Sequence, residues 1–225
     1  MSDNILNKKI EIKNEKQIKV LLFIIVLRHV STYLFDIDMY IPSAFWSMVV
    51  GCMIFMIITL PCLIAYKKVG LYKIEVDFKN KKQYIYGVLL VIPMILCASI
   101  SSGESLYDMF TSLEDKYVMR ESDNFLWLFI YYMFVVALTE EFCYREYIQG
   151  ELKVLLNKLA FLAPAIAAFC FAYMHIVQGS VGQVRFNVMV GLVLGYARYF
   201  IKDCTFISLV IAHGLYDFIA VYYCW

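Results

Sequence analysis

A cluster of ionisable side chains lies in otherwise apolar stretches in the second half of this 225-residue chain. The segments VVALTEEFCYREYIQGEL, FCFAYMHIV and LVIAHGLYDFIAV contain Glu140, Glu141, Arg145, His175, His213 and Asp217. An ionisable group near the centre of a bilayer costs on the order of 2.5 to 3.5 kcal/mol, so each of them requires a partner or a function. Carboxylates and imidazoles transfer protons in hydrolytic reactions, and the cluster therefore predicts a catalytic site.

Helical spacing divides these residues into groups. Neighbours in a helix diverge by about 100°, whereas residues four apart share a face. Glu141 precedes Arg145 by four residues, so we expect an ion pair inside the bundle, which leaves Glu140 free for another role. His213 and Asp217 are also four apart, and we expect them to act as one unit.

The depth of the residues gives a second expectation. If the helices that carry Glu140 and His175 form an antiparallel hairpin turning around Asn157 and Lys158, each residue lies about 17 positions from the turn. The carboxylate and the imidazole then reach a similar level and can meet. His213 lies about eight residues into its own helix, so this count places it at a shallower level.

Two kinds of chemistry fit these side chains. Burial disfavours the ionised form of a carboxylate such as Glu140, which makes it a better base for taking a proton from water. One imidazole can then orient the water while the other, with its carboxyl neighbour, serves the oxyanion. Alternatively, Glu140, His175 and His213 hold a zinc ion with water in the open position. The residue types do not decide between the two.

The composition places these residues in a membrane protein. The chain is 62% hydrophobic and only 17% charged, with a mean hydropathy of +0.70, which is too apolar for a water-soluble domain. Apolar windows predict an all-α, polytopic transmembrane helical bundle of about seven spans. The predicted spans are residues 20–35, 43–66, 84–100, 125–149, 159–177, 186–200 and 205–223.

The chain divides into three regions on this basis. Residues 1–19 form a lysine-rich tail, residues 20–120 contain the first membrane helices and their loops, and residues 121–225 contain the catalytic helices. In the sixth predicted span, Gly191 and Gly195 are four apart and predict a face for close helix packing.

Lysine and arginine predict the orientation of the bundle. The tail holds Lys8, Lys9, Lys13, Lys16 and Lys19, and the loop after the second span holds Lys67, Lys68, Lys73, Lys79, Lys81 and Lys82. The opposite loops hold only Lys116, Arg120 and Arg185. The positive-inside rule therefore predicts a multi-pass protein of the cell membrane with a cytoplasmic N-terminus and an external C-terminus. Because 20 basic residues nearly balance 19 acidic ones, nucleic acid is a poor candidate partner.

The motifs carry a resemblance to a known family. EEFCYR matches EExxxR, FAYMH matches FxxxH and HGLYD matches HxxxD/N, in the same order and each on its own predicted helix. From about Phe125 onward the chain resembles the CAAX-protease and bacteriocin-processing family of intramembrane endopeptidases, which includes type II CAAX prenyl endopeptidases. The resemblance implies a helical bundle with a cavity opening toward the cytoplasm, in which a peptide bond is hydrolysed within the membrane.

The resemblance also implies roles for the residues. Glu140 is the general base, His175 helps to hold the water, His213 and Asp217 serve the oxyanion, and Glu141 and Arg145 are mainly structural. Asp217 stands where prenyl-protein members carry Asn, and an ionised Asp cannot donate to an oxyanion. Asp217 is therefore either protonated or orients His213.

The expected partners are the lipid bilayer and a peptide or membrane-associated protein substrate. The resemblance leaves room for bacteriocin immunity or the processing of pheromone peptides. Two other functions fit the residues: a catalytically silent bacteriocin-immunity protein, and a proton-coupled membrane transporter in which the buried acids and histidines relay protons.

Overall fold

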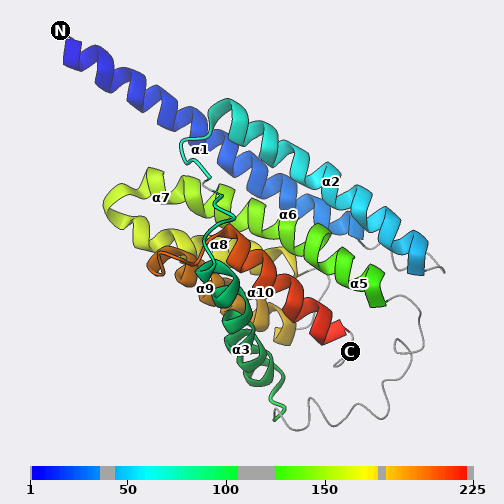
Figure 1. Cartoon of the computed structure of the whole chain (residues 1–225). Coiled ribbons are helices and arrows are strands. Elements are labelled where there is room, and N and C mark those ends of the chain that lie inside the picture. Colours follow the sequence, from blue (N-terminus) through cyan, green and yellow to red (C-terminus); the bar gives the residue numbers. More distant parts are fainter. Residues whose placement is uncertain (1, 36–43, 75, 106–124, 177–180, 222–225) are drawn as a thin grey trace.

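The computed structural model describes residues 2–35, 44–74, 76–105, 125–176 and 181–221. Within these ranges the regular structure is helical, with no strand (Figure 1). The elements are α1 (Ser2–Phe35), α2 (Ala44–Val69), α3 (Lys82–Ser102), α5 (Phe125–Tyr131), η4 (Tyr132–Ala137), α6 (Leu138–Glu141), η5 (Phe142–Gln149), α7 (Gly150–Leu156), η6 (Asn157–Leu162), α8 (Ala163–Met174), α9 (Val181–Phe200) and α10 (Phe206–Ile219). η4 and η5 are π-helical, and η6 is a 3₁₀-helix.

Three described helical segments are long and apolar enough to cross a membrane: Val49–Val69, Lys82–Ser102 and Phe125–Met174. A shorter apolar helix covers Phe206–Ile219. Backbone groups inside a bilayer must be hydrogen-bonded within the protein, and long apolar helices meet this requirement. The chain is therefore a helical membrane protein, as the composition predicted, while the number of about seven spans stays a prediction.

The 50-residue segment Phe125–Met174 is a helical hairpin. Helix α7 ends where Asn157 adopts φ +49°, and after the 3₁₀-helix η6 the chain returns as α8, which packs against η5. The turn thus lies where the sequence predicted it. The other expected spans agree with observed helices to within a few residues, with two exceptions: α1 begins at Ser2, far before the predicted residue 20, and α9 begins five residues before the predicted residue 186.

The division of the chain into three regions stays a prediction. The expected boundary at residues 19 and 20 falls inside the continuous helix α1, so the lysine-rich tail and the first span are one helix. The boundary at residues 120 and 121 lies outside the described residues.

Local sequence signals explain where two site-bearing helices begin. Pro164 occupies the first turn of α8, where its missing N–H costs no hydrogen bond. α10 begins with a capping box, in which Thr205 and Ser208 satisfy each other's backbone donors. These starts fix the registers that place His175 at the end of α8 and His213 within α10.

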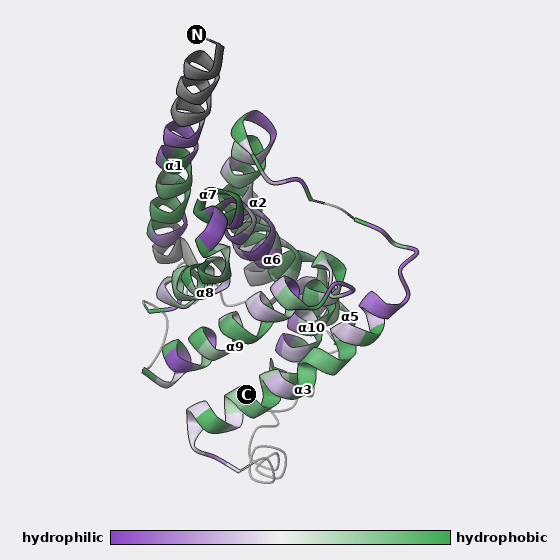
Figure 2. Ribbon diagram, turned by 90° about the vertical axis from the view of Figure 1, so that its left-hand side faces the viewer, coloured by the Kyte–Doolittle hydropathy of each residue, from purple (hydrophilic) through white to green (hydrophobic). Residues whose placement is uncertain are grey.

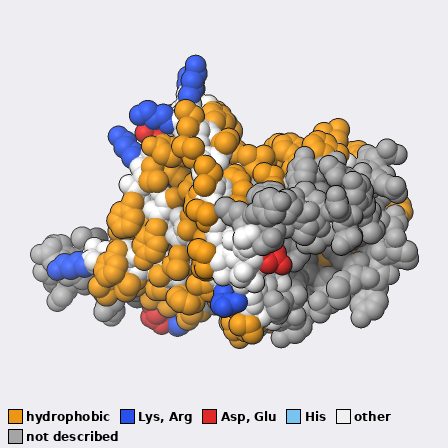
Figure 3. Space-filling model, turned by 90° about the horizontal axis from the view of Figure 1, so that it is seen from below, with side chains coloured by type: hydrophobic (Ala, Val, Ile, Leu, Met, Phe, Trp, Pro, Cys, Tyr) orange, Lys and Arg blue, Asp and Glu red, His pale blue; other side chains and the backbone are white. Residues whose placement is uncertain are grey.

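Apolar side chains cover the outside as well as the inside of the bundle. One buried cluster joins α3, α9 and α10, and a second joins α1, α2, η5 and α8. Apolar residues also run along the outside of α2 and α3, whereas polar residues gather in the connection between these helices (Figure 2). On the face shown in Figure 3, hydrophobic side chains cover most of the described surface. Such a surface suits contact with lipid.

Glycines allow close contacts between helices, among them those at Gly87, Gly191 and Gly195; another joins Gly214 of α10 to Met133 of η4. A Cβ on Gly87 would lie 2.8 Å from the Cβ of Ile211, and one on Gly191 would lie 2.9 Å from the Cβ of Ala168. A Cβ on Gly195 would lie 3.2 Å from the Cβ of Pro164. The packing role predicted for Gly191 and Gly195 is confirmed, because both face α8.

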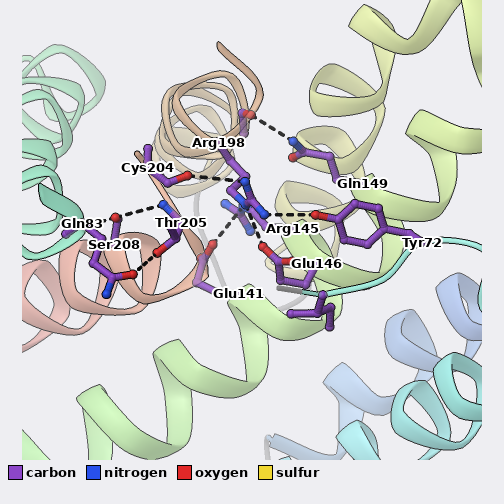
Figure 4. A network of polar contacts seen from close by, with 12 residues as sticks. Tyr72, Gln83, Glu141, Arg145, Glu146, Gln149, Arg198, Cys204, Thr205 and Ser208 are labelled. Atoms are coloured by element: carbon purple, nitrogen blue, oxygen red, sulfur yellow. Dashed lines mark hydrogen bonds and ion pairs between the residues drawn. The ribbon is translucent and has the colours of Figure 1, made fainter. Parts of the chain in front are cut away.

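A polar network ties the connection after α2 to the helices (Figure 4). Arg198 donates through Nε to Glu146 at 2.8 Å and through Nη2 to the hydroxyl of Tyr72 at 3.0 Å. The backbone N–H groups of Leu71 and Tyr72 donate to the Glu151 carboxylate at 2.9 and 3.1 Å. The end of the bundle near this connection is therefore held together by hydrogen bonds between elements far apart in the sequence.

A further contact closes the same end. Asn80 and Lys82 both donate to the carboxylate of Asp203, between α9 and α10. Hydrogen bonds from Asn80 and Lys82 lower the pKa of the Asp203 carboxyl below its ordinary value, so the group is ionised at neutral pH.

Candidate active site

The two neighbouring glutamates lie on a short α-helical segment between two π-helical ones. α6 contains only Leu138–Glu141, with η4 before it and η5 after it. The Thr139 hydroxyl donates to the carbonyls of Val135 at 2.6 Å and Val136 at 3.1 Å, which satisfies acceptors where the winding changes. π-Helical turns are rare and are frequent at functional sites, because the extra residue re-aims the side chains around it.

Glu141 joins two helices through its two carboxylate oxygens. Its Oε2 lies 3.2 Å from Arg145 Nε, and its Oε1 lies 2.7 Å from Nδ1 of His213. All three side chains are buried. The predicted ion pair between Glu141 and Arg145 is confirmed, and the hydrogen bond to His213 is an addition that helical spacing alone did not indicate. Because a carboxylate only accepts, Nδ1 of His213 carries a proton and the orientation of the ring is fixed.

The other nitrogen of His213 faces two further carboxylates. Nε2 lies 3.3 Å from Oδ2 of Asp217 and 3.8 Å from Oε2 of Glu140. The predicted pairing of His213 with Asp217 is therefore confirmed. Depth counting placed His213 at a shallower level than Glu140, which is wrong, since the two side chains are neighbours. Arg198 donates both to Glu146 and to the carbonyl of Cys204, so α10 begins level with Glu146. The count had assumed that it begins level with the hairpin turn near Asn157, which lies further along the helix.

His175 is the first residue after α8, with φ −89° and ψ 0°. Its Nδ1 lies 3.0 Å from the carbonyl oxygen of Phe171, so Nδ1 donates and Nε2 is left as an acceptor when the ring is neutral. His175 and Glu140 line the same cavity, as the sequence predicted.

Phe171 is the packing platform of the site. Its ring centroid lies 4.9 Å from that of His175 and 6.0 Å from that of His213. The Arg145 guanidinium lies over the same ring, 4.4 Å from the centroid. The sequence motif contained this phenylalanine, but its spacing did not indicate that one ring would contact the basic groups of three helices.

The site opens into a cavity of about 520 Å³. Glu140, His175, His213 and Asp217 all line it, so the structure brings together the four residues predicted to be catalytic. The volume is typical of pockets that hold small ligands or short peptide segments. Most of the remaining lining is apolar and comes from α3, α9 and α10.

Several polar residues that line the cavity were not foreseen, among them Asn187 and Tyr132. Asn187 on α9 is buried, and its Nδ2 has no hydrogen-bond partner among the described residues. Tyr132 on η4 also lines the cavity. An asparagine in an apolar membrane helix costs free energy, so its occurrence within FNVMVGLVLG is enough to mark Asn187 as a candidate functional residue from the sequence.

The position of the cavity conflicts with one pair of expectations. The cavity lies away from the lysine-rich connection between α2 and α3. The positive-inside rule puts that connection in the cytoplasm, whereas the family resemblance implies a cavity opening toward the cytoplasm. For this bundle the two expectations cannot both hold.

The donor geometry bears on the zinc alternative. Among the residues that the structure describes, no three His, Cys, Asp or Glu side chains are arranged to hold a metal ion. Glu140, His175 and His213 thus share a cavity without forming a common ligand set.

One comparison with known proteins gives a match. Residues 122–219 match the family model described as Type II CAAX prenyl endopeptidase Rce1-like, and this range contains all three motifs. No curated protein matches the chain, and no solved structure matches it.

Proposed function

We propose that this chain hydrolyses a peptide bond in a membrane-associated substrate. Its residues 122–219 match the model of the Rce1-like family of type II CAAX prenyl endopeptidases. The family implies a protease. One observation carries the proposal furthest: Glu140, His175, His213 and Asp217 come from three separate elements and line a single cavity. A buried carboxylate beside two imidazoles is a suitable arrangement for moving protons to and from water.

Glu140 acts as the general base. It takes a proton from a water molecule while the water oxygen forms a bond to the scissile carbonyl carbon, and the carbonyl π electrons move to oxygen. When the tetrahedral intermediate collapses, the C–N bond breaks and Glu140 returns the proton to the leaving nitrogen. The products are a carboxylic acid and an amine. His175 orients the attacking water through Nε2, which is free because Nδ1 is bonded to the Phe171 carbonyl.

His213 stabilises the oxyanion of the intermediate. Its Nδ1–H donates to Glu141, and the ring acts as the imidazolium between three carboxylates, so Nε2 also carries a proton and points into the cavity toward Asp217 and Glu140. Asp217 is the orienting partner of this ring, since an ionised carboxylate has no proton to donate. A fixed donor in a site that excludes bulk water stabilises developing charge without reorganisation at the moment of reaction.

The test compares wild-type protein with Glu140→Gln in proteoliposomes. The probe is a library of internally quenched peptides with apolar residues, plus one farnesylated peptide ending in a CAAX sequence, with reaction in ¹⁸O-labelled water. We expect wild type to release peptides that carry ¹⁸O in the new carboxylate. Glu140→Gln should be slower by about 10²- to 10⁴-fold, because it keeps the size of the side chain but removes the base.

Glu15→Gln is the matched control, because Glu15 is exposed on α1 and pairs only with Lys19. This variant should hydrolyse the peptides at the wild-type rate. Equal rates in Glu140→Gln and wild type would overturn the assignment of the base. A chelator arm addresses the zinc alternative: activity that is lost on chelation and restored by zinc would contradict the metal-free steps.

A further inference from the structure

The cavity occupies only one half of the bundle. The lining residues of α3 begin at Met94 and continue past the helix end to Glu104. The lining residues of α9 fall between Gly182 and Val190, in its first half, and those of α10 begin at His213. α3 and α10 contribute their C-terminal halves and α9 contributes its N-terminal half, and these halves lie at the same end of the bundle. The cavity therefore runs along the helices from the site to the level where α3 ends.

The other half is packed closed. The close helix contacts at Gly87 and Gly195 lie there, and that at Gly191 directly follows the last lining residue of α9, Val190. Each leaves no room for a Cβ without displacement of a neighbour. Beyond them, the network of Arg198, Glu146 and Tyr72 ties helices and connection together (Figure 4). A substrate entering from this end would have to break both layers.

The charges distinguish the two ends. Basic residues at the closed end lie in the connection before α3, around the turn of the hairpin and at the end of α9; they are Lys67, Lys68, Lys73, Lys79, Lys81, Lys82, Lys153, Lys158, Arg198 and Lys202. At the cavity end, within the described residues, Arg185 is exposed, and its Nη2 donates to the carbonyl of Ser101; Arg28 of α1 is buried against Tyr144. By the positive-inside rule the closed end faces the cytoplasm, and the cavity end faces outward.

The lining indicates what the cavity takes. Met94, Ile95, Phe186 and Val190 give apolar walls, and Asn187 supplies a buried amide whose nitrogen is without a partner. An extended peptide with apolar side chains matches this, because its backbone carbonyls need donors while its side chains need a dry surface.

From these observations, and resting on the function proposed above, we propose that the site takes an apolar peptide segment from the external side of the membrane, through the ends of α3, α9 and α10. The substrate class is thus a peptide or membrane-protein segment exposed on the outer face, and a cytoplasmic lipid-modified tail would have no route to Glu140.

Single cysteine substitutions test the route without requiring activity. Ala98→Cys places a thiol in the cavity, Ser102→Cys places one at the end of α3, and Lys81→Cys places one at the closed end. Intact cells are treated with a charged, membrane-impermeant thiosulfonate, and labelling in excess of the wild-type background is measured by mass spectrometry. The same variants are made in a Glu140→Gln background, so that the readout does not depend on hydrolysis.

We expect Ser102→Cys and Ala98→Cys to react in intact cells, and Lys81→Cys to react only after permeabilisation. The proposal is overturned if Lys81→Cys reacts in intact cells, if Ala98→Cys reacts only after permeabilisation, or if Ala98→Cys reacts from neither side.

An activity arm separates this proposal from the proposed function. Quenched apolar peptides added outside intact cells should be hydrolysed by wild type, and modification of Ala98→Cys with a bulky reagent should lower the rate by at least about tenfold, as expected when a site is filled. Modified Lys81→Cys should keep its rate. The expected labelling pattern without any hydrolysis would count against the endopeptidase assignment and leave the external route standing.

Discussion

The closed half and the cavity half of the bundle use polar residues in opposite ways. In the closed half, Glu146 and Gln149 of η5 each bond to α9, although one side-chain oxygen of each has no hydrogen-bond partner among the described residues. In the cavity half, the contact of Glu140 to His213 is long, at 3.8 Å, and the amide nitrogen of Asn187 has no hydrogen-bond partner within the described part of the chain. A polar group that bonds to another helix stabilises the fold, whereas an unpaired group that lines a cavity is available to a substrate.

Between the halves lies Glu141, whose removal should have the largest effect on stability. Glu141→Leu would leave the Arg145 guanidinium buried without its charge partner, so we expect a loss of about 3 to 5 kcal/mol. Unfolding in mixed detergent micelles, followed by circular dichroism, measures it. Glu140→Gln is the comparison and should stay within about 0.5 kcal/mol of wild type. A similar loss in both variants would mean that the halves do not differ as described.

The second prediction compares the effect on stability of enlarging one small residue in each half of the bundle. Gly191→Leu would force a side chain against Ala168 and should cost about 1 to 3 kcal/mol or more. Ala98→Leu extends into the cavity and should leave stability nearly unchanged while slowing peptide hydrolysis. Thermal unfolding and the quenched-peptide rate are measured on both proteins. The interpretation fails if Ala98→Leu is the less stable of the two.

Asn187→Leu should have the smallest effect on stability. The side chains are similar in volume, and the substitution removes an amide nitrogen that has no partner, so the protein should unfold at the same temperature or slightly higher. If the amide binds substrate, KM should rise by about tenfold with kcat nearly unchanged, because uniform binding is lost. A fall in kcat with no change in KM would instead place Asn187 in the chemical step.

Much of the site was predictable because short-range geometry determines it. Residues four apart on one helix had to be neighbours, which gave the pairs of Glu141 with Arg145 and of His213 with Asp217. The ranges of the apolar helices followed from hydropathy, and the hairpin turn followed from the polar break at Asn157.

The missed features depend on packing between helices. Glu141 contacts His213 because α6 and α10 lie side by side, and no spacing within either helix contains that information. The location of the cavity likewise depends on which helix halves separate. The π-helical winding around α6 was also not predictable, because residues 132–149 have no proline or glycine pattern that marks it.

The π-helical winding has a consequence for how this protein tolerates change in sequence length. Each wide turn accommodates a residue that a regular helix would not, so deleting one residue from η4 would let the segment relax to α-helix while the residues on either side keep their register relative to Glu140. The same deletion in a regular helix such as α10 would turn the residues on one side of it by about 100° relative to those on the other. We therefore expect frame-preserving deletions of a single codon to be less damaging in η4 than in α10.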